Sequence, residues 1–296
     1  MALKPYQISR YPFPIAESLG FETVRYGAIG DGSCFVHAVL RAINPEYVSD
    51  IDSRPEIART TRENIASALT EEDWINISGE QARIEIEKQL RKILMPRLTK
   101  ALSYRRDEAE KLFNRIIGIV SRKLRDPNKV IDQALYAKSI IQAIEEDING
   151  RLSDELYIYE LVGRAMERAL EKTKKRIGGS GFVEDDMMEI ILDALGVNVL
   201  FIDFDTNMPY IREGFDPSRP KTVIINYLDQ YHFEIIGIIK KEPIKIGKRL
   251  IKPGKYKILF RNNHPLVKAV REYIQEQKEE EPYREVLFEE SEEEIE

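Results

Sequence analysis

The spacing of apolar residues divides the chain into a long helical stretch and a shorter stretch of strands. From about Pro55 to Arg176, apolar side chains recur every three or four residues, which is the period of amphipathic helices. The breaks between these helices are predicted at Gly79, Pro96, Asp126-Pro127 and Asn149-Gly150. The clearest helix carries an apolar stripe from Leu152 to Thr173, with Ser153 placed to cap it. The pattern predicts extensive packing between helices.

The pattern changes at Ile177. The glycine loop Gly178–Gly181 leads into a short amphipathic helix, Val183–Leu195, which Gly196 ends. Three apolar runs predict buried strands, at residues 197–202, 222–227 and 232–239. The short link between the last two predicts a hairpin. A further strand is expected at residues 255–260 and a further helix at 265–277.

The first part of the chain has little periodicity. Residues 1–25 contain three prolines and are expected to form an extended lead-in. Two glycines and an aspartate in the segment from Gly30 to Cys34 predict a tight loop. The run from Cys34 to Ala42 is apolar and lacks glycine, so it predicts a buried helix whose first turn carries Cys34.

Composition is that of a globular protein with one large domain or two modest ones, since the chain has 296 residues, 43% of them hydrophobic and 32% charged. The net charge of -6 argues against a nucleic-acid partner. From Glu276 onward glutamate dominates, which predicts an acidic, disordered tail.

The single cysteine allows no internal disulfide and suits a reducing compartment. Neither a secretory signal nor a membrane-spanning run is evident, so no membrane partner is expected. The expected location is intracellular and cytoplasmic, which for a pathogen protein would be the host cell. No cofactor and no metal site are expected, since cysteine and histidine do not cluster and no phosphate-binding loop is present.

Thiol chemistry has few candidate residues in this chain. Cys34 lies at a predicted helix N-terminus, whose partial positive charge favours the thiolate. His232 and Glu234 point to one face of a predicted strand, about 7 Å apart along it. Glu234 could therefore orient His232 as a general base. His37, one helical turn after Cys34, is a rival base, and His264 is expected to be a loop residue.

Three sequence blocks resemble the ovarian-tumour (OTU) family of cysteine proteases. The first, Gly30-Asp31-Gly32-Ser33-Cys34-Phe35-Val36-His37-Ala38, is similar to the signature around the nucleophile, with Ser33 in place of the usual Asn. The second, Gly178–Val199, is similar to the glycine loop, helix and strand of the family. The third, Tyr231-His232-Phe233-Glu234, resembles the histidine strand, with Phe233 in place of Tyr or Trp.

The resemblance implies an α/β (α+β), papain-like OTU fold with a small central sheet flanked by helices, and an inserted helical lobe. It implies a deubiquitinase that hydrolyses isopeptide or thioester-type bonds at the ubiquitin C-terminus, with ubiquitin, polyubiquitin and ubiquitinated proteins as partners. Carried across, Cys34 is the nucleophile, His232 the general base and Glu234 the orienting residue, while Asp31 lies near the oxyanion hole.

The expected domain limits follow from these blocks. They are a lead-in at 1–19, the OTU domain at 20–240 with a helical insertion at about 55–176, an extension at 241–275 and the acidic tail at 276–296. Two alternatives stay open. One is a catalytically idle module that binds ubiquitin, and the other is a protease for a ubiquitin-like modifier or an ordinary peptide.

Overall fold

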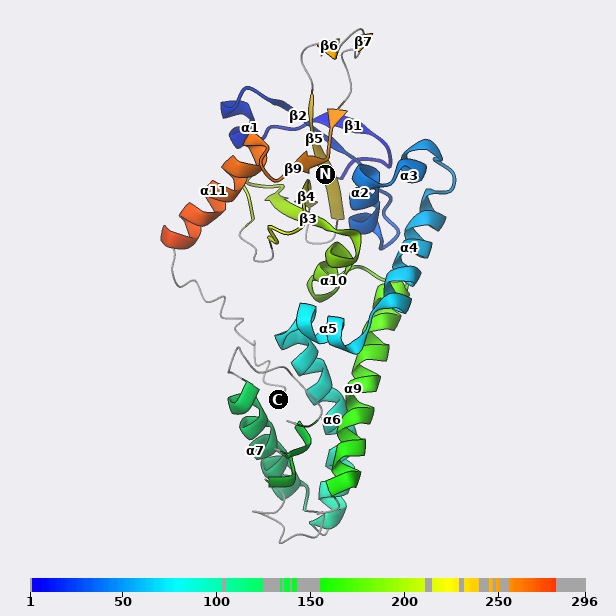
Figure 1. Ribbon diagram of the computed structural model, residues 1–296, viewed down its shortest axis with the longest axis vertical. Helices are drawn as coiled ribbons and strands as arrows, with labels where there is room; N and C mark the ends of the chain where they lie inside the picture. Colours follow the sequence, from blue (N-terminus) through cyan, green and yellow to red (C-terminus); the bar gives the residue numbers. More distant parts are fainter. Residues whose placement is uncertain are drawn as a thin grey trace, which may run out of the picture. The chain divides into compact units, whose positions relative to one another are not determined.

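The computed structural model describes residues 2–102, 105–124, 134, 136–138, 140–142, 155–210, 215–228, 232–239, 245–246, 249–250 and 256–280. They fall into two compact units. The first comprises Met1–Gly30, His37–Ser49 and Gly196–Glu296, and the second comprises Asp31–Val36 and Asp50–Leu195. The named strands all belong to the first unit, and the second is helical (Figure 1). The predicted mixed α/β class is confirmed.

One mixed sheet organises the first unit. Its strand order is β1-β2-β5-β4-β3, with β8 paired to β5 and β9 paired to β4. The bounds are β1 Ile8–Arg10, β2 Glu22–Tyr26, β3 Val197–Asp203, β4 Lys221–Leu228, β5 His232–Ile239, β8 Tyr256–Lys257 and β9 Phe260–Arg261. Strands β3 and β4 are parallel, and the other described pairs are antiparallel. A separate two-stranded ladder joins β6 (Lys245–Ile246) to β7 (Arg249–Leu250).

The three strands expected from apolar runs are confirmed as β3, β4 and β5. The hairpin pairing is confirmed too, because β4 and β5 are antiparallel with Leu228 opposite His232. The link at residues 229–231 lies outside the described residues. The strand expected at 255–260 is wrong in detail, because two short strands with different partners, β8 and β9, occupy that region.

The core of the first unit lies between the sheet and two helices. Ile224 and Ile236 are opposite each other in β4 and β5 and are fully buried. They join a cluster that includes Phe13, before helix α1 (Pro14–Ser18), and the apolar face of α11 (Pro265–Glu280). Burial of these apolar side chains is the main source of stability here.

The two ends of the first unit differ from the simple sequence expectation. The lead-in contains β1 and α1, because β1 pairs with β2 and Phe13 is fully buried. Helix α11 confirms the helix expected at 265–277 and continues to Glu280, past the expected start of the acidic tail. The rest of that tail, residues 281–296, lies outside the described residues.

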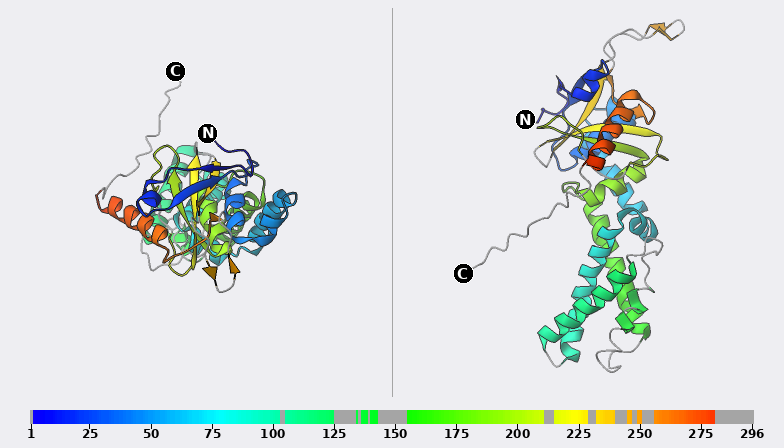
Figure 2. Two further views of the ribbon diagram at one scale, coloured as in Figure 1. Left: turned by 90° about the horizontal axis from the view of Figure 1, so that it is seen from above. Right: turned by 90° about the vertical axis from the view of Figure 1, so that its left-hand side faces the viewer.

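The second unit is built mainly from six helices of the described chain. They are α4 (Arg54–Ala68), α5 (Glu71–Ser78), α6 (Glu80–Ala101), α7 (Arg106–Leu124), α9 (Glu155–Gly178) and α10 (Asp185–Leu195). Helix α9 packs against α4 and α6, and α6 packs against α7 (Figure 2). The expected helix at 183–195 is confirmed as α10, and Gly196 after it has φ +63°. Among the described residues no helix is long and apolar enough to cross a membrane.

The predicted break at Pro96 is wrong. Helix α6 runs through Pro96 to Ala101, because Leu90, Leu94 and Leu98 keep one buried stripe at four-residue spacing. Packing of that stripe outweighs the local cost of a proline within a helix. The break at Gly79 is confirmed, since Gly79 ends α5 with φ +46°. The breaks expected at 126–127 and 149–150, with Leu152 and Ser153, lie outside the described residues.

Candidate active site

Cys34 is the first residue of helix α2 (Cys34–Ile43), as the sequence predicted, and its side chain is buried. The preceding turn is held by Asp31, whose Oδ1 accepts the backbone N–H of Ser33 at 2.9 Å. This side chain-to-backbone bond is typical of aspartate in tight turns. The N–H of Ser33 is therefore engaged by the Asp31 carboxylate, which fixes the turn directly before the N-terminus of α2.

Gly32 joins this turn directly to the glycine loop. Its φ is +84°, a conformation that side chains rarely adopt. A Cβ at this position would lie 2.4 Å from the carbonyl oxygen of Ser180. A Cβ on Gly30, by contrast, would meet no atom within 4 Å. Two blocks that are about 150 residues apart in sequence are therefore packed backbone to backbone, and only the second glycine of the turn is required by that packing.

Arg62 of α4 also binds this turn, and the sequence reasoning missed it. Its side chain is 1% exposed, and one guanidinium nitrogen donates to Ser33 Oγ at 2.8 Å and to the Gly181 carbonyl at 2.9 Å. A signal was available in the sequence. Arg62 lies at helical spacing from Ala58, Ile65 and Ala66, which form the buried stripe of α4, so it is a cation on an apolar face.

His232 and Glu234 lie on one face of β5, as the strand alternation predicted. The distance from His232 Nε2 to Glu234 Oε1 is 3.7 Å, an ion-pair distance that exceeds a hydrogen bond. Glu234 is fully buried, and its other carboxylate oxygen accepts from Arg25 Nη1 at 2.9 Å. The backbone N–H of Leu3 donates to Oε1. Glu234 thus faces His232 while an arginine and an amide hold the carboxylate in place.

The neighbourhood of Glu234 is polar but buried. Asn226 lies opposite it in β4, and Asn226 Oδ1 accepts from the hydroxyl of Tyr11 at 3.0 Å. Burial raises the pKa of Tyr11 well above its ordinary value, with a smaller, opposing contribution from Arg25. Tyr11 therefore stays protonated and remains a donor. Such a network fixes the orientation of buried carboxylates.

The two other histidines occupy distinct surroundings. His37 is 1% exposed, and its Nδ1 lies 2.8 Å from the hydroxyl of Tyr47. His264 packs against Phe260, and its Nδ1 accepts the N–H of Leu266 at the start of α11. Burial, with a smaller contribution from Lys257, lowers the pKa of His264. Each of these two rings thus has a polar contact within its own part of the fold, His37 with Tyr47 and His264 with the start of α11.

The four predicted site residues are divided between the two units, with two residues in each. Asp31 and Cys34 belong to the second unit, where the structure brings them together with Arg62 and the glycine loop. His232 and Glu234 belong to the first unit, where the structure brings them together with Arg25. Within the described part of the chain, no group of three or more His, Cys, Asp or Glu side chains is arranged to hold a metal ion.

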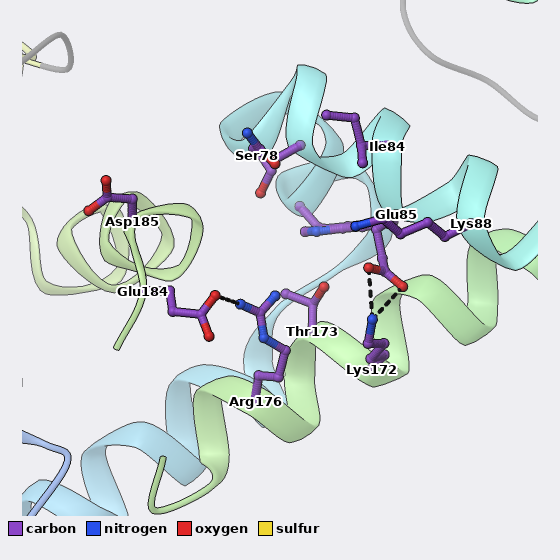
Figure 3. A pocket seen from close by; sticks show the side chains of 11 residues that line it. Ser78, Ile84, Glu85, Lys88, Lys172, Thr173, Arg176, Glu184 and Asp185 are labelled. Atoms are coloured by element: carbon purple, nitrogen blue, oxygen red, sulfur yellow. Dashed lines mark hydrogen bonds and ion pairs between the residues drawn. The ribbon is translucent and has the colours of Figure 1, made fainter. Parts of the chain in front are cut away.

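A polar hollow of about 450 Å³ lies among α5, α6, α9 and α10 of the second unit (Figure 3). Two basic residues near the end of α9, Lys172 and Arg176, line it. Lys172 pairs with Glu85 at 2.9 Å, and Arg176 pairs with Glu184 at 2.6 Å. These ion pairs link α9 to α6 and to the residue directly before α10.

Comparisons with known proteins give one structural match. No model of a known protein family matches the chain. No curated protein matches it either. Among solved structures, the chain is similar to an ovarian-tumour (OTU) domain in complex with ubiquitin, at 12% sequence identity and a TM-score of 0.37, with 93% of this chain and 93% of that chain covered. Similarity at this score carries no weight for family or activity, which depend on the residues of the site.

Proposed function

We propose that the chain is a cysteine-type deubiquitinase in which Cys34 is the nucleophile, His232 the general base and Glu234 the residue that orients it. The observation that carries the proposal is the contact of Gly32 with Ser180, because it packs the cysteine block against the glycine block. The pair of His232 and Glu234 supports it from the third block. The proposed substrates are ubiquitin chains and ubiquitinated proteins.

The first half of the reaction forms a thioester. The Cys34 thiolate attacks the carbonyl carbon of the ubiquitin C-terminal glycine, a C–S bond forms, and an electron pair moves to the carbonyl oxygen. Amides of the Asp31–Cys34 segment bind this oxyanion, and each such donor is worth roughly 10²–10³ in rate. The C–N bond then breaks while the imidazolium of His232 gives its proton to the departing lysine amine, which is worth roughly 10²–10⁴.

The second half hydrolyses the thioester. His232, now neutral, takes a proton from water as the water oxygen attacks the same carbonyl carbon. Collapse of this intermediate breaks the C–S bond and returns Cys34 as a thiolate beside an imidazolium. Glu234 stabilises that imidazolium and selects the ring orientation, as the third member of a triad does. Because Nε2 faces Glu234, Nδ1 is the atom assigned to the proton transfers.

Asp31 has a structural part in this proposal. Its carboxylate braces the turn through the N–H of Ser33, and the oxyanion is assigned to the other amides. Asp31→Asn is therefore expected to retain activity better than His232→Ala, because an Asn oxygen can accept the same bond.

The test is covalent capture by ubiquitin propargylamide, read by gel shift, on the purified wild-type protein and on Cys34→Ala, His232→Ala and His37→Ala. We expect an adduct with wild type and His37→Ala, none with Cys34→Ala and a slower one with His232→Ala. An adduct with Cys34→Ala would refute the assignment of Cys34 as the nucleophile. Capture of His232→Ala at the wild-type rate would refute the assignment of His232 as the base.

Absence of an adduct with wild type would refute ubiquitin as the substrate. Matched probes built on ubiquitin-like modifiers would then separate the two alternatives. Capture by one of them indicates a protease for that modifier, whereas binding of ubiquitin without capture by any probe indicates an idle module.

A further inference from the structure

Arg62 is a buried cation of helix α4. Its side chain is 1% exposed, and among the described residues no Asp or Glu forms an ion pair with it. Burying an ionised group is costly unless other groups compensate its charge. The burial of Arg62 therefore needs an explanation other than a salt bridge.

The guanidinium of Arg62 ties the cysteine turn to the end of α9 and the glycine loop. Its Nε donates to the carbonyl of Ile177 at 2.6 Å, and Nη2 donates to that of Arg176 at 3.1 Å. Nη1 donates to Ser33 Oγ at 2.8 Å and to the Gly181 carbonyl at 2.9 Å, with a long contact to the Gly32 carbonyl at 3.5 Å. Carbonyls at a helix C-terminus favour a cation, which offsets part of the cost of burial.

The remaining electrostatic partners of Arg62 are at the candidate nucleophile. Burial lowers the pKa of Arg62, while the negative charges of Asp31 and of ionised Cys34 oppose this. The attraction is mutual, so the same cation favours the thiolate over the thiol at Cys34. Arginine suits this role because it stays protonated when it is buried.

We propose that Arg62 is a positioning residue that holds the cysteine turn against the glycine loop, and that its fixed positive charge stabilises the Cys34 thiolate. The inference deepens the proposed function by adding a charge outside the Cys34, His232 and Glu234 set. It predicts that part of the thiolate stabilisation persists when the imidazole is absent.

Several other groups near Cys34 also affect the pKa of its thiol, and the experiment must distinguish their effects from that of Arg62. Asp31, in the preceding turn, disfavours the thiolate, and the N-terminus of α2 favours it. His37 lies one turn along α2 with its Nδ1 beside Tyr47. The glycine loop presents carbonyls to the site at Gly181. His232 is the imidazole assigned to the site in the proposed function.

The experiment is a pH titration of thiolate absorbance at 240 nm, with Cys34→Ala as the blank. Since the chain has one cysteine, the difference spectrum reports Cys34 alone. Arg62→Gln removes the charge, and Arg62→Lys keeps it without the planar fork. Arg59→Gln is the matched control, because Arg59 is an exposed arginine of the same helix, paired with Glu56 and Glu63.

We expect Arg62→Gln to raise the thiol pKa by about one unit or more, the lower end of the effect of a neighbouring opposite charge. Arg62→Lys is expected to keep the thiol pKa within about half a unit of wild type, and Arg59→Gln to leave it unchanged. An unchanged pKa in folded Arg62→Gln would overturn the proposal, as would an equal rise in Arg62→Lys.

If Arg62→Gln does not fold, Arg62→Met decides the question, because it keeps a long side chain in place without the charge. The thiol pKa is expected to rise there by about one unit or more, and an unchanged thiol pKa overturns the proposal. None of these titrations uses ubiquitin. If the thiol pKa rises in Arg62→Gln but ubiquitin propargylamide does not capture the wild type, only the proposed substrate is refuted. If the probe captures the wild type but the thiol pKa does not rise in Arg62→Gln, only the role of Arg62 is refuted.

Discussion

Gly32→Ala tests whether the cysteine turn must pack against the glycine loop. An alanine at φ +84° would store roughly 1–2 kcal/mol of backbone strain. Its Cβ would also lie 2.4 Å from the Ser180 carbonyl oxygen, where an ordinary contact begins at 3.4 Å. One of the two segments must therefore move by about 1 Å, and a displacement of that size near the reacting atoms can cost about 100-fold in rate.

The expected result is a loss of about 100-fold in the rate of adduct formation with ubiquitin propargylamide. Unfolding in urea should show a loss of about 1–2 kcal/mol or more in the free energy of unfolding. Gly30→Ala is the matched control, since it makes the same change two residues earlier in open space. It is expected to react at close to the wild-type rate.

Equal rates for wild type and Gly32→Ala would refute the reasoning, because the turn would then tolerate displacement. Equal losses in the two glycine variants would refute it as well. In that case the sensitivity would belong to the whole loop and not to the contact with Ser180.

Three further predictions concern the rest of the molecule. Arg25→Met should lower the free energy of unfolding by roughly 3 kcal/mol, because it removes the cation paired with buried Glu234. The double variant Arg25→Met with Glu234→Gln should recover part of that loss, and urea unfolding in which the losses of the two single variants simply add would contradict the prediction. The thermal midpoint of wild type should rise as pH increases toward about 6.5, because the pKa of His264 is lowered in the folded state and His264 therefore binds more protons in the unfolded state. His264→Asn should weaken this dependence of the thermal midpoint on pH, and an unchanged dependence would disprove the prediction. Leu94→Ala should cost about 2–5 kcal/mol, since this side chain is 3% exposed within α6, and a loss below about 1 kcal/mol would contradict the packing described for that helix.

Strong local patterns made much of the fold predictable. The apolar runs of β3, β4 and β5 are long, with only single polar residues such as Asn198, Asn226 and Glu234 within them. Cys34 follows a turn rich in glycine. Strand and helix bounds were therefore close to the observed ones. The break predicted at Pro96 was wrong because the local free-energy cost of a proline within a helix is smaller than the stabilisation from packing of the leucine stripe around it. Local preference identifies elements, while packing decides where some of them end.

The supporting residues of the site were not predictable in the same way. Arg25 and Leu3 reach Glu234 only because β2 pairs with β5, which brings together segments more than 200 residues apart. Arg62 reaches the cysteine turn through helix packing in the second unit. The pair of His232 and Glu234 could be predicted because strand alternation fixes it locally.

The pairing of β2 with β5 also sets the order in which the chain can fold during its synthesis. Leu3 and Glu234 are 231 residues apart, so at roughly 5–20 residues per second the ribosome needs roughly 10–50 s to deliver the second after the first. The segment Asp50–Leu195 emerges within that interval, and its helices can pair with one another as they appear. The sheet closes last, and until then β2 has an unpaired edge that a chaperone or a second chain could occupy.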